Sequence, residues 1–427
     1  MIACFVYIVF GVIAFAVMYI RTKDVLNPVG IMSFSLISVF GLSNLYLNPI
    51  QTPFSFKTHV VVLFAFFEMV LIGVISLKPG KAAKNEKSFV TPQFNHVYYF
   101  AASIALVAVC ILLFQSNASV SLLEAPESGL DKKSDVSFDG ASRVLVYCAQ
   151  CLPFIAIYAF FHLLYSNHER SLSRLFDSSF IIFAYLYAFF ITVSRGTLIV
   201  MILGMLFLYT RKHPISLRAF FVSIVVIALL SSFYMLLRVD SSSMIYAGSS
   251  GSRLFNVFYN YTALNYSNLD ALISNQDFEF TGFLFEWEPI AKFIGIHNDN
   301  ALYLHETGAL NARTMLYGFY HDLGIVGVLI YTALITSALC VMYRFAQNGA
   351  FQWWLMLAVL QKAIFMVCFG DYFIRAGGVA GWIPYLLTLG VVYLCFSNGA
   401  SCRTAANDSE DSRSRVQRKT RSLKSQR

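Results

Sequence analysis

The sequence has few charged residues. Asp, Glu, Lys and Arg make up 13% of its 427 residues, whereas soluble domains carry about 25%. Hydrophobic residues make up 58%, including 41 Phe and 24 Tyr, and apolar runs recur along the whole length. So little polar surface cannot cover a soluble globule of 48.0 kDa. The composition therefore predicts an all-α polytopic membrane protein.

The sequence also lacks the motifs of nucleotide and metal sites. It contains no G-x-x-x-x-G-K-[ST], G-x-G-x-x-G, D-x-D, G-x-S-x-G or H-E-x-x-H. Its eight Cys lie in apolar spans or in the C-terminal tail, without a spacing typical of disulfides or zinc. We therefore expect no cofactor and no metal. The net charge of +8 does not indicate nucleic-acid binding, because membrane topology accounts for the basic loops and tail.

Eleven segments are apolar enough to be membrane spans, since a spanning helix needs about 20 mostly apolar residues. They are 2–20, 29–48, 59–77, 97–115, 144–165, 178–193, 197–210, 217–237, 323–343, 351–370 and 379–396. The first has no basic region or cleavage site, so we expect a retained span rather than a signal peptide. The predicted units are a first bundle at 1–237, a periplasmic loop at 238–322, three last spans in 323–396 and a disordered basic tail at 397–427.

Basic residues set the predicted orientation, because Lys and Arg are enriched in short cytoplasmic loops. With the C-terminus in the cytoplasm, the short inside loops hold 12 basic residues and the short outside loops hold six. The tail adds eight more. An odd number of spans then places the N-terminus outside.

The segment 178–210 is too long for one span and short for two. A single helix of its 33 residues would be about 50 Å long, against a hydrocarbon core of about 30 Å. We therefore expect two short helices joined at Ser194-Arg195-Gly196, where Gly196 permits a tight turn. Arg195 would then lie near the outer membrane surface, where it is either functional or snorkels to lipid headgroups.

The predicted loop at 238–322 is large enough to build a site. Within 239–321, eight acids accompany three basic residues, and Tyr and Trp are frequent. Carboxylates that bind hydroxyls and rings that stack on pyranoses suit a sugar site, but the same composition suits a cap lying on the membrane interface. Five outer arginines suit a diphosphate, because Arg binds phosphate bidentately and keeps its charge; alternatively they neutralise the loop acids. These are Arg195, Arg238, Arg253, Arg313 and Arg375.

The segment from Asn311 to Gly327 resembles the signature of bacterial oligosaccharide repeat-unit polymerases, the Wzy-type O-antigen and capsule polymerases. It has an N-x-x-T, an aromatic-rich stretch and then Asp322-Leu-Gly with a second glycine three residues later. Ser194-Arg195-Gly196 resembles the S-R-G turn of the same family and of the related O-antigen ligases. The plan of many spans with one large, late periplasmic loop is similar too.

The resemblance implies a GT-C-like glycosyltransferase of the bacterial inner membrane that uses neither nucleotide nor metal. It would move the growing glycan from undecaprenyl diphosphate onto a new lipid-linked repeat unit at the periplasmic face. Its partners would be the undecaprenyl-diphosphate-linked oligosaccharide and, in the same membrane, a chain-length regulator and a flippase. The alternatives are an O-antigen ligase, a lipid-linked oligosaccharide flippase or transporter, and a membrane protein without chemistry.

The candidate site residues form three groups. The diphosphate would be bound by Arg195, Arg313, Arg253 and Arg375. The candidates for the base are Glu286, Glu288, Asp299, His321 and Asp322. Asp322 could instead cap the helix that it opens. The sugar would stack on Tyr317, Tyr320 and Trp287.

Two further ionisable residues, Glu68 and Lys362, lie near the centres of predicted spans. An unpaired charge is costly at that depth. We expect that Glu68 and Lys362 pair with each other, or that Lys362 lies near the path of the lipid diphosphate.

Overall fold

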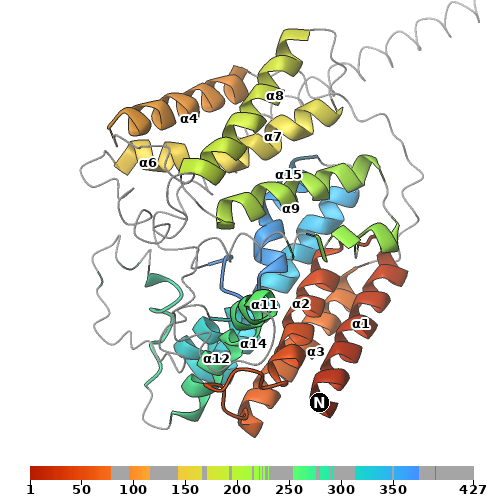
Figure 1. Cartoon of the computed structure of the whole chain (residues 1–427). Helices are drawn as coiled ribbons and strands as arrows, with labels where there is room; N and C mark the ends of the chain where they lie inside the picture. Colours follow the sequence, from red (N-terminus) through yellow and green to blue (C-terminus); the bar gives the residue numbers. More distant parts are fainter. Residues whose placement is uncertain are drawn as a thin grey trace, which may run out of the picture.

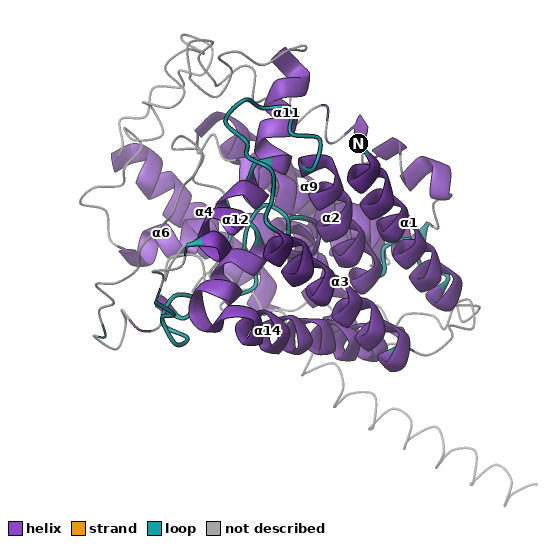
Figure 2. Cartoon of the chain, turned by 90° about the horizontal axis from the view of Figure 1, so that it is seen from below, coloured by secondary structure: helices purple, strands orange, loops and turns teal. Residues whose placement is uncertain are grey.

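The structure is a computed structural model. It describes residues 1–77, 96–115, 143–165, 171–191, 195–213, 216–220, 222–223, 225–226, 229, 253–275, 279–288, 291, 296, 313–348, 351–374 and 390. Within these ranges the regular elements are helices, and no strand occurs (Figure 2). The prediction of an all-helical chain is confirmed for the described residues.

The helices have the following bounds. They are α1 Ile2–Thr22, α2 Pro28–Ser43, α3 Phe56–Ser76, α4 His96–Gln115, α6 Arg143–Gln150, α7 Leu152–Tyr165, α8 Ser171–Leu186, η2 Tyr187–Ile191, α9 Arg195–Lys212, α11 Arg253–Ala263, α12 Asn265–Ser274, α14 Met315–Gln347 and α15 Phe351–Phe365. Proline and side-chain caps set some of the starts. α2 begins at Pro28, and Asn27 accepts a hydrogen bond from the backbone N–H of Gly30 at 3.0 Å.

Six described helical segments are long and apolar enough to cross a membrane. They are Ile2–Thr22, Phe56–Ser76, Val97–Phe114, Val144–Tyr165, Leu172–Phe189 and Met315–Gln347. The predicted spans at 29–48, 197–210 and 351–370 correspond to the shorter helices α2, α9 and α15. The predicted spans at 217–237 and 379–396 lie largely outside the described residues. The chain is thus a multi-pass helical membrane protein by the length and composition of its helices.

The described helices form three neighbouring groups (Figure 1). α1, α2 and α3 pack together, and α14 packs along α3. α4, α6, α7 and α8 form a second group, in the upper part of the view. α9 and α15 pack on each other between these groups, with α9 against α7 and α15 against α2. These two helices therefore connect the two halves of the bundle.

The segment 178–210 contains two helices, as its length predicts. α8 ends in the π-helical turn η2, and α9 begins at Arg195. Residues 192–194 lie outside the described part, and so does the side chain of Arg195. Arg195 and Gly196 are the first two residues of α9, so Gly196 does not form the predicted tight turn.

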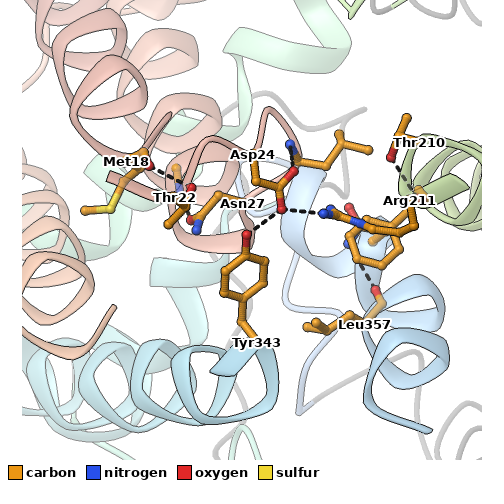
Figure 3. A network of polar contacts seen from close by, with 12 residues as sticks. Met18, Thr22, Asp24, Asn27, Thr210, Arg211, Tyr343 and Leu357 are labelled. Carbon is orange, nitrogen blue, oxygen red and sulfur yellow. Dashed lines mark hydrogen bonds and ion pairs between the residues drawn. The ribbon is translucent and has the colours of Figure 1, made fainter. Parts of the chain in front are cut away.

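Asp24 joins three segments at one end of the bundle (Figure 3). Its carboxylate accepts hydrogen bonds from Arg211 Nη1 at 2.6 Å and from the Tyr343 hydroxyl at 2.5 Å. The Arg211 guanidinium also lies 4.4 Å from the ring centres of both Phe207 and Trp354. The turn after α1, the end of α9 and the end of α14 therefore meet. The orientation predicted from the basic residues assigns all three to cytoplasmic loops.

Polar contacts at the opposite end of α2 hold α11 and α12 against the connection from α2 to α3. Asp270 of α12 accepts hydrogen bonds from the backbone N–H of Ser55 at 2.8 Å and from Thr58 Oγ1 at 2.5 Å. Asn48 Nδ2 donates to Asn260 Oδ1 of α11 at 3.0 Å. Residues 253–275 of the predicted loop are thus packed against the bundle, at the same end as the N-terminus (Figure 1).

Candidate functional site

The site is built around a kink in α14. Leu323 and Gly324 have non-helical backbone angles, and Gly324 has a φ of 63°, a conformation that glycine adopts without steric cost. A Cβ at Gly324 would lie 2.9 Å from Cζ of Phe280, and a Cβ at Gly327 would meet the carbonyl oxygen of Phe319. The structure therefore requires glycine at both positions of the family-like motif, at Gly324 because of its positive φ and at Gly327 because the backbone of Phe319 lies close. α14 begins at Met315, earlier than the predicted span start, and its kink falls at that start.

Asp322 holds residues 279–288 against this kink. Its Oδ1 accepts hydrogen bonds from Thr281 Oγ1 at 2.7 Å and from the backbone N–H of Phe285 at 2.8 Å. Its Oδ2 accepts from the backbone N–H of Glu286 at 3.2 Å and from the Tyr331 hydroxyl at 3.1 Å. The side chain is buried. These four donors occupy both oxygens, so Asp322 is suited to positioning the segment and not to acting as a base. It caps this segment, whereas we expected a cap of its own helix.

His321 belongs to the same structural junction. Its ring stacks on Phe285 with the centroids 3.8 Å apart, and its Nδ1 lies 3.2 Å from Thr281 Oγ1. Its carbonyl oxygen accepts the backbone N–H of Thr281 at 3.2 Å. The side chain has no exposed surface. A base role for His321 does not fit this placement, because an acceptor hydroxyl cannot reach the ring.

The junction places Glu286 and Glu288 near Arg313. The Glu286 carboxylate is buried and occupies the space beside Gly318, where a Cβ would overlap it. Burial lowers the pKa of the Arg313 guanidinium, and the nearby charges of Glu286, Asp371 and Glu288 oppose that shift. Glu288 is half-buried and more accessible than Glu286. The arrangement is one guanidinium among three carboxylates.

Two aromatic rings fix the Arg313 guanidinium from the side. Its central carbon lies 4.9 Å from the ring centre of Phe285 and 5.7 Å from that of Tyr317. Arg313 precedes α14, and its guanidinium nevertheless lies beside the ring of Tyr317 in the first turn of that helix. The backbone next to Arg313 is fixed too, since the N–H of Met315 donates to the carbonyl of Val367 at 2.8 Å.

The three predicted sugar-stacking residues differ in exposure. Tyr317 is completely buried, so a sugar cannot stack on it in this structure, and its predicted role is corrected to that of an Arg313 neighbour. Tyr320 is partly buried, with its ring edge-on to Phe280 at 5.9 Å. Trp287 is 38% exposed, and its Nε1 donates to the Tyr331 hydroxyl at 3.1 Å. Trp287 is therefore the ring that is most available to a sugar.

The other predicted residues contribute less to the described geometry. Arg195 and Arg253 are the first residues of α9 and α11, and their side chains are not described. Arg375 and Asp299 lie outside the described residues. Sequence reasoning missed Asp371, Gly318, Thr281 and Tyr331. A glycine inside the aromatic run was the one signal for Gly318, and nothing local pointed to the others.

Comparison of the chain with protein-family models, curated proteins and solved structures finds no match. The resemblance to repeat-unit polymerases therefore stays a prediction from the residues that carry it. Among the described residues, no group of three or more His, Cys, Asp or Glu is placed to hold a metal ion.

Proposed function

We propose that this protein is a repeat-unit polymerase for O-antigen or capsule glycans in the bacterial inner membrane. It transfers the growing glycan from undecaprenyl diphosphate to a hydroxyl of a new lipid-linked repeat unit at the periplasmic face. The acceptor oxygen forms a bond to the anomeric carbon, while the bond from that carbon to the diphosphate oxygen breaks. The acceptor proton passes to a carboxylate, and undecaprenyl diphosphate leaves with the electron pair.

The observation that carries this proposal is the position of the Arg313 guanidinium at the kinked start of α14, packed on Phe285 and Tyr317 and within range of the charges of Glu286 and Glu288. A departing diphosphate needs a cation, and an acceptor hydroxyl needs a base. We assign Arg313 to the diphosphate and the more accessible Glu288 to the acceptor proton. Glu286 orients Arg313. Asp322 acts through the backbone of Glu286 as a positioning residue.

The proposed topology has eleven spans with the N-terminus in the periplasm, the C-terminus in the cytoplasm and a GT-C-like plan. Two groups of contacts support it. The Asp24 cluster joins segments that the basic residues assign to the cytoplasm. The contacts of Asp270 and Asn48 join segments that the same rule assigns to the outside.

The test is glycan transfer between purified lipid-linked repeat units by the purified protein in detergent. We expect Glu288→Gln to lower the transfer rate by about 10²–10⁴-fold, the usual contribution of a general base. Glu279→Gln is the matched control, because Glu279 is an exposed carboxylate of the same segment. Full activity in Glu288→Gln would contradict the assignment of the base.

The lipopolysaccharide pattern of a deletion strain separates a polymerase from a ligase or a flippase. Loss of a polymerase leaves core plus one repeat unit. Loss of a ligase leaves core alone, and loss of a flippase leaves core without surface repeat. A pattern of either of the last two kinds would overturn the proposed function.

A further inference from the structure

Lys362 is a cation in the last turn of α15 and has no carboxylate partner among the residues that the structure describes. Its Nζ lies 4.1 Å from the ring centre of Tyr372. Glu68 and Lys362 both belong to the described part of the chain, and no ion pair joins them there, so one of the two expected arrangements, their pairing, is not formed. An ammonium in a membrane helix without an acid partner is costly and indicates a functional role.

The chain after α15 is folded so that Tyr372 covers Lys362. Gly370 makes room for the ring, since a Cβ there would lie 3.2 Å from Cε2 of Tyr372. Asp371 fixes the following turn by accepting hydrogen bonds from the backbone N–H groups of Phe373 at 2.9 Å and Ile374 at 3.2 Å. The aromatic cover of Lys362 is therefore a fixed feature of this segment.

Lys362 lies toward the same end of α15 as two of the four arginines that the sequence assigns to the diphosphate, Arg195 and Arg313. α9 and α15 run antiparallel, because Gly204 approaches the carbonyl of Ala358 and the later Arg211 approaches the earlier Trp354. The start of α9, at Arg195, therefore lies toward the end of α15 that carries Lys362.

The same end of α15 is also joined to Arg313. The carbonyl of Val367 accepts the N–H of Met315, two residues after Arg313. The charge of Asp371, next to Tyr372, acts on the Arg313 guanidinium. The start of α9, Lys362 and the residues next to Arg313 thus lie toward the same end of α15.

We infer that Lys362 is a second cation for the lipid diphosphate, alongside Arg313. This inference rests on the proposed function and names a residue that the family-like motifs do not include. A diphosphate carries more negative charge than one guanidinium neutralises, and an ammonium offers three donors to its oxygens. The Tyr372 ring stabilises the ammonium when the lipid is absent, and it leaves the donors available because a ring face accepts no strong hydrogen bond.

The test measures binding of undecaprenyl diphosphate to the purified full-length protein in nanodiscs by its intrinsic tryptophan fluorescence. We expect Lys362→Met to raise the Kd about 10- to 100-fold, as the loss of a hydrogen bond to a charged group predicts. Lys362→Arg keeps a cation and should stay within about threefold of the wild type. Lys57→Met is the matched control, because it removes a lysine from the same predicted side at an exposed position.

Folding and binding failures are distinguishable in this design. Lys362→Met leaves no carboxylate unpaired, so its thermal midpoint should equal or exceed that of the wild type. Equal Kd values for Lys362→Met and the wild type would overturn the role of Lys362 alone. A wild-type protein that does not bind undecaprenyl diphosphate would overturn the proposed function as well. Equally tight binding of inorganic pyrophosphate would overturn a site for the lipid carrier, because the lipid would then contribute nothing.

Discussion

The variant Asp322→Asn separates positioning from proton transfer. The asparagine amide keeps one acceptor oxygen, which can still accept hydrogen bonds from Thr281 Oγ1 and from the backbone N–H of Phe285. Its nitrogen would replace Oδ2 and face the N–H of Glu286, so that two donors meet. The Tyr331 hydroxyl can reorient only partly, because its oxygen already accepts a hydrogen bond from Trp287 Nε1 at 3.1 Å.

The expected loss of stability follows from these contacts. A buried N–H without an acceptor costs about 1–3 kcal/mol. The remaining bonds change from charge-assisted to neutral and lose further strength, so the total is about 2–4 kcal/mol. We therefore expect Asp322→Asn to lower the thermal midpoint of the purified protein in detergent by several degrees. Residues 279–288 should also become more sensitive to protease.

Two results distinguish the roles of Asp322. If it positions Glu286 and Arg313, transfer activity and thermal midpoint should fall together, and Glu279→Gln should change neither. If Asp322→Asn keeps the wild-type midpoint and loses transfer, the carboxylate acts in the chemistry, and the reasoning from its four donors is refuted.

Three further predictions concern the same cluster and the topology. Gly318→Ala should lower the transfer rate as Glu286→Gln does, because the new methyl group would occupy the place of the Glu286 carboxylate. A wild-type transfer rate in Gly318→Ala would show that the Glu286 carboxylate does not lie beside Gly318. Arg195→Ala and Arg313→Ala should each cost nearly as much as the double variant, since groups that act as one unit are not additive; rates that multiply would show separate roles. A phosphatase fused after Arg427 should be inactive, and one fused within 250–310 active, while the reverse would contradict the orientation.

The sequence predicts the helical membrane character because hydrophobic length and composition are local properties. The same holds for the presence of two helices within 178–210, because the length of that segment is also a local property. Long-range contacts are not local. Nothing near residue 322 indicates that its carboxylate caps residues 285 and 286, because that cap depends on how a distant loop folds back on α14.

The burial of individual side chains, like the long-range contacts, could not be predicted from residue type. Tyr317 was expected to stack on a sugar, and its ring does lie beside Arg313. The ring is nevertheless covered by residues 279–288, with Phe285 at 5.9 Å. Likewise, charge alone left two alternatives for Lys362, a pair with Glu68 or a place near the path of the lipid diphosphate, and in the structure its ammonium lies against the ring of Tyr372. Tertiary packing decided both outcomes.

The most direct test of the central claim is transfer by the purified protein with defined undecaprenyl-diphosphate-linked repeat units as both donor and acceptor. The account predicts that the wild type forms lipid-linked dimers and longer glycans. It also predicts that Arg313→Ala and Glu288→Gln form almost none, while Glu279→Gln retains the wild-type rate. The absence of any lengthened product with the wild type, or undiminished products with both site variants, would contradict it.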